Sequence, residues 1–152
     1  MFDLYDEFKS IISALSEREI DYAVCGGLAM AVHGLARATV DIDLLIPADD
    51  LEAVRAAAKK LGYTIDAIPI TFAAGAIEIR RVSKIDAETG VMLSLDLLLV
   101  TPQIAEVWTS RSTVEWEGGQ LKVVSPQGLI ALKMLRGSGQ DLDDIKRLQE
   151  LE

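Results

Sequence analysis

Two aspartates separated by one residue, Asp41 and Asp43, stand at the start of an apolar run that extends through Ile46. Its composition predicts a β-strand, in which residues i and i+2 point to the same face. Two carboxylates side by side repel each other unless a cation lies between them. Oxygen ligands of this kind suit magnesium, which also binds phosphate oxygens and water. A solvated strand end is the alternative that the pair alone leaves open.

A glycine pair, Gly26 and Gly27, lies between an apolar run at Tyr22–Cys25 and a small-residue segment at Leu28–Leu35. The first run predicts a strand and the second a helix. Glycines between them permit a positive-φ turn and let a ligand approach the backbone. The N-terminus of the helix that follows offers unpaired N–H groups and the positive end of its dipole to phosphate. An ordinary turn is the competing interpretation.

Two further charged residues lie in apolar surroundings. Asp96 is enclosed in the run Met92–Val100, where an ionised carboxylate without a partner would be very costly. It must pair with a basic residue or face a cleft and a cation, and the presence of the pair Asp41 and Asp43 elsewhere in the chain favours the cleft. Lys133 is the single lysine of the apolar segment Leu129–Leu135. It either serves a ligand or extends its ammonium group to water.

Together these residues resemble a known signature. Gly26-Gly27, thirteen intervening residues and then Asp41-Ile42-Asp43 are similar to the motif of the nucleotidyltransferase superfamily that includes DNA polymerase beta. The run Arg37–Asp43 most resembles the AbiEii-type and minimal nucleotidyltransferase branch. A lysine followed by an Asp-x-x-Asp-Ile segment recurs in that branch, and Lys133 with Asp141–Ile145 matches it.

The resemblance implies a metal-dependent enzyme that uses a nucleoside triphosphate (NTP). Asp41, Asp43 and Asp96 would hold Mg²⁺ or Mn²⁺ as catalytic residues, with Asp96 also the base for the incoming hydroxyl. The implied nucleotide-binding residues are Gly26, Gly27, Arg37, Thr39 and Lys133. Relatives carry a basic residue before the first aspartate of the last segment, where this chain has Gln140.

The expected architecture is an α+β fold with an α/β-like core: the nucleotidyltransferase fold, with a small mixed sheet, helices packed on it and a C-terminal helical pair. Helices are predicted over residues 3–16, from Asp49 as N-cap to Leu61, and over residues 102–110. A further helix is predicted from Ser125-Pro126 to Arg136. The last helix is predicted to begin at Asp141, with Leu142, Ile145 and Leu148 facing inward. Hairpins are predicted for 76–85 with 91–100 and for 113–117 with 120–124. A loop is expected at 71–75.

Composition limits the partners. A chain of 152 residues predicts one domain, residues 1–152. Its apolar runs fall short of a membrane helix, its start does not resemble a signal peptide, and Cys25 is the only cysteine, so a cytoplasmic protein is expected. The net charge of -9 disfavours general nucleic-acid binding. A protein or small-molecule acceptor is therefore favoured over nucleic acid, with tRNA as an alternative.

Two functions follow. The first is transfer of a nucleoside monophosphate from an NTP to an acceptor hydroxyl, with a role in a toxin–antitoxin system as one setting. The alternative is a non-catalytic or regulatory partner-binding protein, antitoxin-like, that retains the fold. The intact carboxylates favour the first, whereas the small size and acidic charge favour the second.

Overall fold

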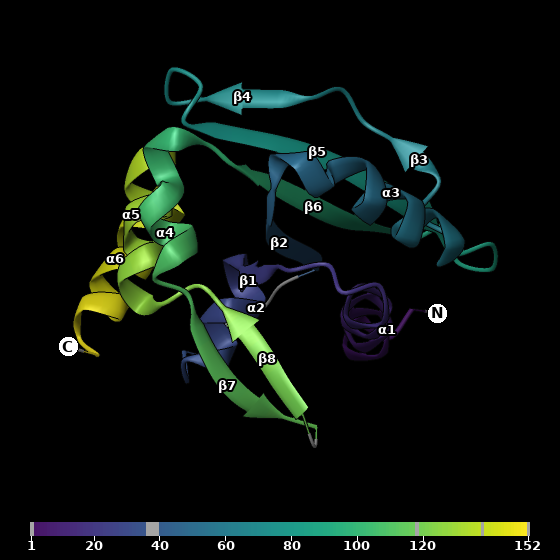
Figure 1. Ribbon diagram of the computed structural model, residues 1–152, viewed down its shortest axis with the longest axis horizontal. Coiled ribbons are helices and arrows are strands. Elements are labelled where there is room, and N and C mark those ends of the chain that lie inside the picture. Colours follow the sequence, from purple (N-terminus) through teal and green to yellow (C-terminus); the bar gives the residue numbers. More distant parts are fainter. Residues whose placement is uncertain (1, 36–39, 118, 138, 152) are drawn as a thin grey trace.

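The computed structural model describes residues 2–35, 40–117, 119–137 and 139–151, apart from the side chain of Gln140 (Figure 1). Its helices are α1 (Leu4–Glu17), α2 (Gly26–Val32), α3 (Leu51–Lys60), α4 (Ala105–Thr109), α5 (Pro126–Arg136) and α6 (Gly139–Gln149), with short 3-10 turns η1 (Ala48–Asp50) and η2 (Pro102–Ile104). Its strands are β1 (Ala23–Cys25), β2 (Asp41–Pro47), β3 (Ile65–Asp66), β4 (Ile70–Phe72), β5 (Ile77–Ile85), β6 (Met92–Val100), β7 (Ser112–Trp116) and β8 (Gly119–Val123).

The strands form one mixed sheet in the order β3-β5-β6-β2-β1-β8-β7, with β4 also paired to β5. Two pairs are parallel, β2 with β6 and β1 with β8. The remaining pairs are antiparallel, and they include both predicted hairpins, β5–β6 and β7–β8. The mixed sheet and the α+β class are therefore confirmed.

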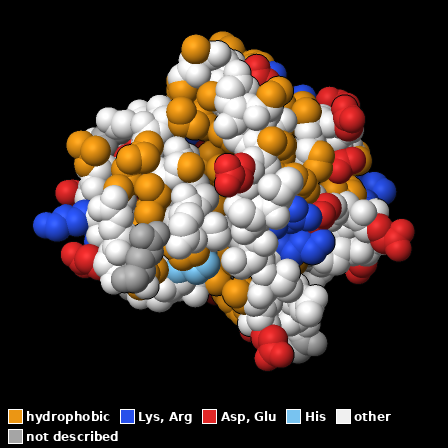
Figure 2. Space-filling model, turned by 60° about the vertical axis from the view of Figure 1, so that its left-hand side comes forward, with side chains coloured by type: hydrophobic (Ala, Val, Ile, Leu, Met, Phe, Trp, Pro, Cys, Tyr) orange, Lys and Arg blue, Asp and Glu red, His pale blue; other side chains and the backbone are white. Residues whose placement is uncertain are grey.

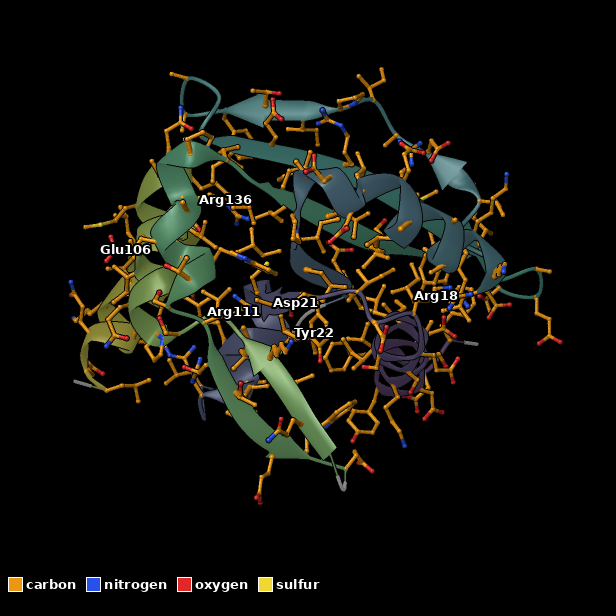
Figure 3. The ribbon with its side chains drawn as sticks, in the orientation of Figure 1. Arg18, Asp21, Tyr22, Glu106, Arg111 and Arg136 are labelled. Carbon is orange, nitrogen blue, oxygen red and sulfur yellow. The ribbon has the colours of Figure 1, made fainter. Side chains whose placement is uncertain are left out.

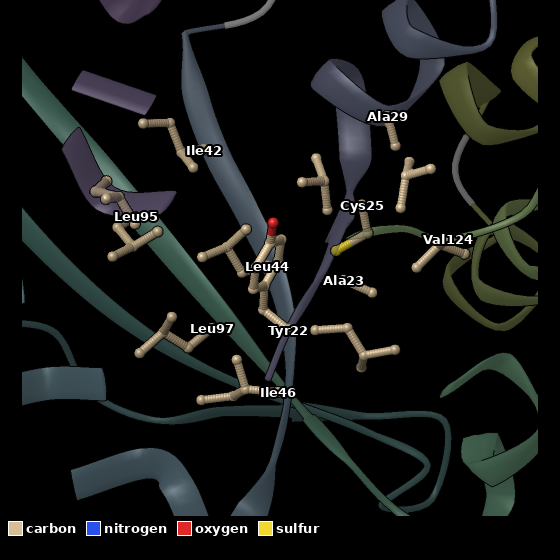
Figure 4. Packing of buried hydrophobic residues seen from close by; sticks show 14 of the residues in the cluster. Tyr22, Ala23, Cys25, Ala29, Ile42, Leu44, Ile46, Leu95, Leu97 and Val124 are labelled. Carbon is tan, nitrogen blue, oxygen red and sulfur yellow. The ribbon is translucent and has the colours of Figure 1, made fainter. Parts of the chain in front are cut away.

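The two faces of the central strands differ in character. Ile42 of β2 pairs with Leu95 of β6, and Leu44 pairs with Leu97, so these side chains share one face. They are fully buried in the core (Figure 4). Helices α1 and α3 pack beside each other and contact Leu95 on this side. The alternating residues, Asp43 and Asp96, therefore lie on the opposite face.

Ion pairs fasten the β7–β8 hairpin to the beginning of β1. Arg111 and Lys122 both donate hydrogen bonds to the carboxylate of Asp21, and Figure 3 shows Arg111 beside Asp21. The guanidinium of Arg111 also lies 3.8 Å from the ring centre of Trp108. The ring centre of Trp116 lies 5.5 Å from the ring centre of Phe8 in α1. Both tryptophans serve packing, as the sequence indicated.

The structure differs from prediction at several element ends. Residues 48–50 form a 3-10 turn, so α3 begins at Leu51, and no side-chain cap hydrogen bond is present where Asp49 was expected to cap. Part of the expected loop at 71–75 is strand, because Ile70–Phe72 pairs with β5. The face that includes α5 and α6 shows scattered hydrophobic side chains (Figure 2), and Leu142 is 63% exposed there rather than inward.

Gly128 provides a test of the packing between α4 and α5. A Cβ added to Gly128 would lie 2.7 Å from Val124 Cγ1 and 3.2 Å from Val107 Cγ1, whereas a Cβ on Gly139 would meet nothing within 4 Å. We expect Gly128→Ala to lower the free energy of unfolding by about 1–3 kcal/mol through overpacking. Gly139→Ala, the control, should leave it unchanged or raise it. Urea unfolding curves measure both, and equal stabilities would contradict this packing.

Candidate functional site

Four side chains form a row across the sheet. Asp43 of β2 is the register partner of Asp96 on the parallel neighbour β6 and of Cys25 on the antiparallel neighbour β1. Asp96 is in turn the register partner of Arg81 on β5. Residues directly opposite each other on adjacent strands lie on the same face. The register therefore brings two carboxylates together, with a thiol at one end of the row and a guanidinium at the other.

Arg81 binds the carboxylate of Asp96 through both of its oxygens. Arg81 Nε donates to Oδ1 at 2.7 Å and Nη2 donates to Oδ2 at 2.9 Å. The same Nη2 lies 4.0 Å from Asp41 Oδ2. Asp41 lies two residues before Asp43, so it shares the same face, as predicted. Arg81 is thus a cation common to Asp96 and Asp41.

The carboxylates raise one another's proton affinity. Burial raises the pKa of Asp43 to about 7, and the negative charges of Asp96 and Asp41 add to that shift. Arg136 and Arg81 oppose it. Burial and the charge of Asp96 also raise the pKa of Asp41, against the effect of Arg81. A cation bound among these oxygens would relieve the repulsion.

Gly26 allows Asp43 to pack against the backbone. Its φ is +64°, in the left-handed region, and an added Cβ would lie 2.2 Å from Asp43 Oδ2. Both features require glycine. Helix α2 begins at Gly26 itself, so the glycine pair forms the first turn of the helix and not a turn before it. The first N–H groups of a helix have no partner within it, and here they begin beside a carboxylate.

The row opens into a pocket of about 130 Å³ between the sheet and α5. One part of its wall is apolar: Phe72, Ile77, Ile79, Leu98, Leu129 and Leu132. The rest is polar or small: Cys25, Gly26, Gly27, Asp43, Asp96, Lys133, Arg136 and Asp141. The pocket therefore offers a charged end for an ionic ligand and an apolar end for an uncharged group.

Buried ion pairs link α5 to α6 at the charged end. Lys133 is 6% exposed, and Asp141 and Asp144 are fully buried. Lys133 Nζ donates to Asp144 Oδ2 at 2.9 Å and lies 3.6 Å from Asp141 Oδ1. Arg136, which projects from α5 in Figure 3, donates through Nε to Asp141 Oδ2 at 2.9 Å. The predicted motif of one lysine and two aspartates is thus brought together, and Asp141 binds Arg136 from within the first turn of α6.

Several candidates from the sequence fall elsewhere. Arg37 and Thr39 lie outside the described residues. Arg80 does not line the pocket, and its Nη2 lies 4.0 Å from Glu78 Oε2. His33 Nε2 is 2.8 Å from the carbonyl oxygen of Val124, so it holds the end of α2 against the chain near β8. Two consecutive arginines on a strand point to opposite faces, so only one of them can lie on the face of the carboxylates. The sequence did not indicate that Arg81, the partner of Asp96, is that one.

Three carboxylates of the site could serve as ligands of a metal ion. Asp41, Asp43 and Asp96 supply hard oxygen ligands of the kind that Mg²⁺ and Mn²⁺ prefer. Within the described ranges, however, no three His, Cys, Asp or Glu residues are arranged to hold a metal. Both oxygens of Asp96 accept hydrogen bonds from Arg81, so a cationic side chain already compensates this carboxylate. The ligand chemistry fits a divalent cation, provided that Arg81 gives up Asp96.

Comparison with known proteins agrees with this fold. A family model described as an uncharacterised nucleotidyltransferase matches residues 2–150. The Thermotoga maritima protein TM1012, described as a candidate nucleotidyltransferase, superposes with a TM-score of 0.60 at 13% identity, covering 95% of this chain and 91% of that one. ANT(2'')-Ia, solved with adenylyl-2''-tobramycin, superposes with a TM-score of 0.61 at 16% identity, covering 95% and 87%.

JHP933 from Helicobacter pylori shares the fold more loosely, with a TM-score of 0.51 at 17% identity over 96% of this chain and 64% of that one. At these identities the likeness concerns the fold. The search of curated proteins returns no match. Among the helices that the structure describes, none has the length and apolar character needed to cross a bilayer.

Lys133 should contribute strongly to stability. A lysine that served only a ligand could be replaced by Met without loss of stability, but Lys133 forms buried pairs with Asp144 and Asp141. Removing one partner of a buried ion pair costs on the order of 3 kcal/mol. We expect Lys133→Met to lose about that much in urea unfolding. The double variant Lys133→Met/Asp144→Leu should regain most of it, and a single variant as stable as the wild type would refute the structural role.

Asp43 should make stability depend on pH. Its pKa is raised from 3.8 to about 7 in the folded state, so the folded protein holds a proton that the unfolded chain releases near pH 4. The associated stability is complete below pH 4 and is lost as pH rises to about 7. Metal-free wild type should therefore lose on the order of 3 kcal/mol relative to Asp43→Asn between pH 4.5 and 8. Asp49→Asn, at an exposed site, is the control, and parallel profiles for wild type and Asp43→Asn would contradict the assignment.

Proposed function

Because the chain belongs to the family of uncharacterised nucleotidyltransferases, we propose that it transfers a nucleoside monophosphate from an NTP to an acceptor hydroxyl in a metal-dependent reaction. One observation carries the proposal. Asp43 and Asp96 lie side by side in a pocket whose opposite wall bears Lys133 and Arg136. Anionic and cationic groups facing one pocket suit a metal-bound triphosphate, which carries both charges.

Asp41, Asp43 and Asp96 are the residues that would hold Mg²⁺ or Mn²⁺. When bound, such an ion neutralises charge on the reacting phosphate and aligns the attacking and leaving oxygens. The residues supply the position: β2 and β6 fix two of the carboxylates on adjacent strands, and Gly26 keeps the space beside Asp43 clear. Asp96 would take the proton of the acceptor hydroxyl, a role that requires its oxygens to be released from Arg81.

The phosphates would lie between the first turn of α2 and the basic residues of α5. Gly26 and Gly27 bring the backbone N–H groups of the first turn of α2 to the pocket wall. Lys133 and Arg136 supply cationic donors from α5. Both already contact Asp141, so they are positioned before any ligand arrives, and such preorganisation is the main source of catalysis in phosphoryl transfer. Arg37 and Thr39 remain predicted nucleotide-binding residues.

The acceptor is proposed to be compact. The apolar part of the pocket wall suits a small molecule or a single protein side chain better than extended nucleic acid. The net charge of -9 argues in the same direction. ANT(2'')-Ia was solved with an adenylylated tobramycin, a compact molecule, and it supports this size class without identifying the acceptor here.

The branch of the nucleotidyltransferase superfamily and the biological role of the protein remain predictions. The run Arg37–Asp43 and the motif of Lys133 with Asp141–Ile145 support the AbiEii-type branch, and with it a toxin–antitoxin role in the cytoplasm. The second candidate, a regulatory partner-binding protein, is favoured by one observation: Arg81 engages Asp96 and leaves fewer oxygens for a metal.

A labelled-transfer assay tests the proposal. The protein is incubated with each α-³²P-labelled NTP, Mn²⁺ or Mg²⁺, and fractionated cell extract. We expect label to reach a protein or small molecule, and we expect Asp43→Asn to lower transfer at least 100-fold, since Asp43 is a proposed metal ligand. Asp49→Asn is the matched control. Label on tRNA would overturn the compact acceptor, and absence of transfer with every NTP would favour the regulatory candidate.

A further inference from the structure

Arg81 stands where the carboxylates most need a positive charge. Its guanidinium forms two hydrogen bonds to Asp96, at 2.7 and 2.9 Å, and approaches Asp41 to 4.0 Å. Paired hydrogen bonds between a guanidinium and a carboxylate are strong and directional. While they persist, each oxygen of Asp96 has one lone pair engaged by Arg81. The residue that neutralises the site therefore also competes for its oxygens.

The side chains differ in their freedom to move. The side chain of Asp96 is 9% exposed and held on the central strand β6, whereas that of Arg81 is 38% exposed. A long arginine side chain at such a position can turn its charged end into water without disturbing the core. Exchange of the partner of Asp96 therefore requires movement of Arg81 alone.

We propose that Arg81 is a positioning residue that serves as a built-in counterion, competing with the divalent cation for Asp96 and Asp41. In the resting protein it holds Asp96 in its rotamer and compensates the paired negative charge. Asp43 and Asp41 would hold a divalent cation, and Arg81 would then turn to solvent, so that Asp96 would become available as the third ligand. This inference rests on the proposed function, because it assumes that the trio binds metal.

Two arginines in succession supply a matched pair for the test. The register partner of Arg80 is Leu97, whereas that of Arg81 is Asp96, so the two arginines lie on opposite faces of β5. Arg81→Met and Arg80→Met remove one positive charge each from adjacent positions of the same strand. Any general effect of net charge on metal binding is therefore the same in both. A structural role without competition would lower the stability of Arg81→Met and leave its metal affinity unchanged or weaker.

The experiment is calorimetric titration of metal-free protein with Mn²⁺ at pH 8, with folding checked by circular dichroism. We expect Arg81→Met to bind Mn²⁺ about tenfold more tightly than wild type, the factor that follows from removing a competing charge-assisted contact. Arg80→Met should match wild type. The gain should vanish in Arg81→Met/Asp43→Asn, which shows that the site is the carboxylate trio.

Three outcomes overturn the inference. Equal or weaker Mn²⁺ binding by folded Arg81→Met, with wild type binding normally, makes Arg81 a structural partner and leaves the proposed function intact. If Arg80→Met gains as much Mn²⁺ affinity as Arg81→Met, the effect comes from the change in net charge alone. No Mn²⁺ binding by either wild type or Arg81→Met removes both the inference and the metal-dependent function. If Arg81→Met does not fold, Arg81→Lys keeps the charge but loses the paired hydrogen bonds, and it should still bind more tightly than wild type.

Discussion

The parallel pairing of β2 with β6 is the constraint on which the rest of the site depends. Its register sets Asp43 directly beside Asp96, and it sets Leu44 beside Leu97 on the other face. The core fixes this register, because a shift by one residue would bury the carboxylates and expose the leucines. The packing of the apolar face under α1 and α3 therefore holds two like charges together on the opposite face. That repulsion is an electrostatic cost of assembling the site.

The charges that offset this repulsion come from separate parts of the chain. Arg81 belongs to β5, and Arg136 belongs to α5, where Lys133 also lies. Asp141 and Asp144 of α6 hold the two basic residues of α5 by hydrogen bonds of 2.9 Å. Consequently the site is complete only after the sheet and the C-terminal helix pair have packed together. A loss of α6 packing would release Lys133 and Arg136 before it disturbed the carboxylates.

The sequence predicted those parts of the fold that follow from local patterns. Alternation gave the β5–β6 hairpin, and Ser125 with Pro126 marked the start of α5, where the serine side chain does accept a hydrogen bond from Gly128 N. It could not predict which of Arg80 and Arg81 pairs with Asp96, because that depends on strand register. It placed Lys133 near a ligand but missed the full burial of Asp144, which depends on how α6 packs. It placed Leu142 inward, whereas α6 turns that residue to solvent.

The electrostatics of the pocket suggest which ligand can open it. Two charged groups that line the pocket already have a partner of opposite charge: Asp96 pairs with Arg81, and Arg136 pairs with Asp141. A bare metal ion must compete with a guanidinium, and a bare triphosphate must compete with carboxylates. If the carboxylates hold metal as proposed, a metal–triphosphate complex would meet both requirements together, since its cation would compete with Arg81 for Asp96 while its phosphates would attract Arg136. Under the proposed function, metal and nucleotide should therefore bind with positive coupling, each lowering the electrostatic cost of the other.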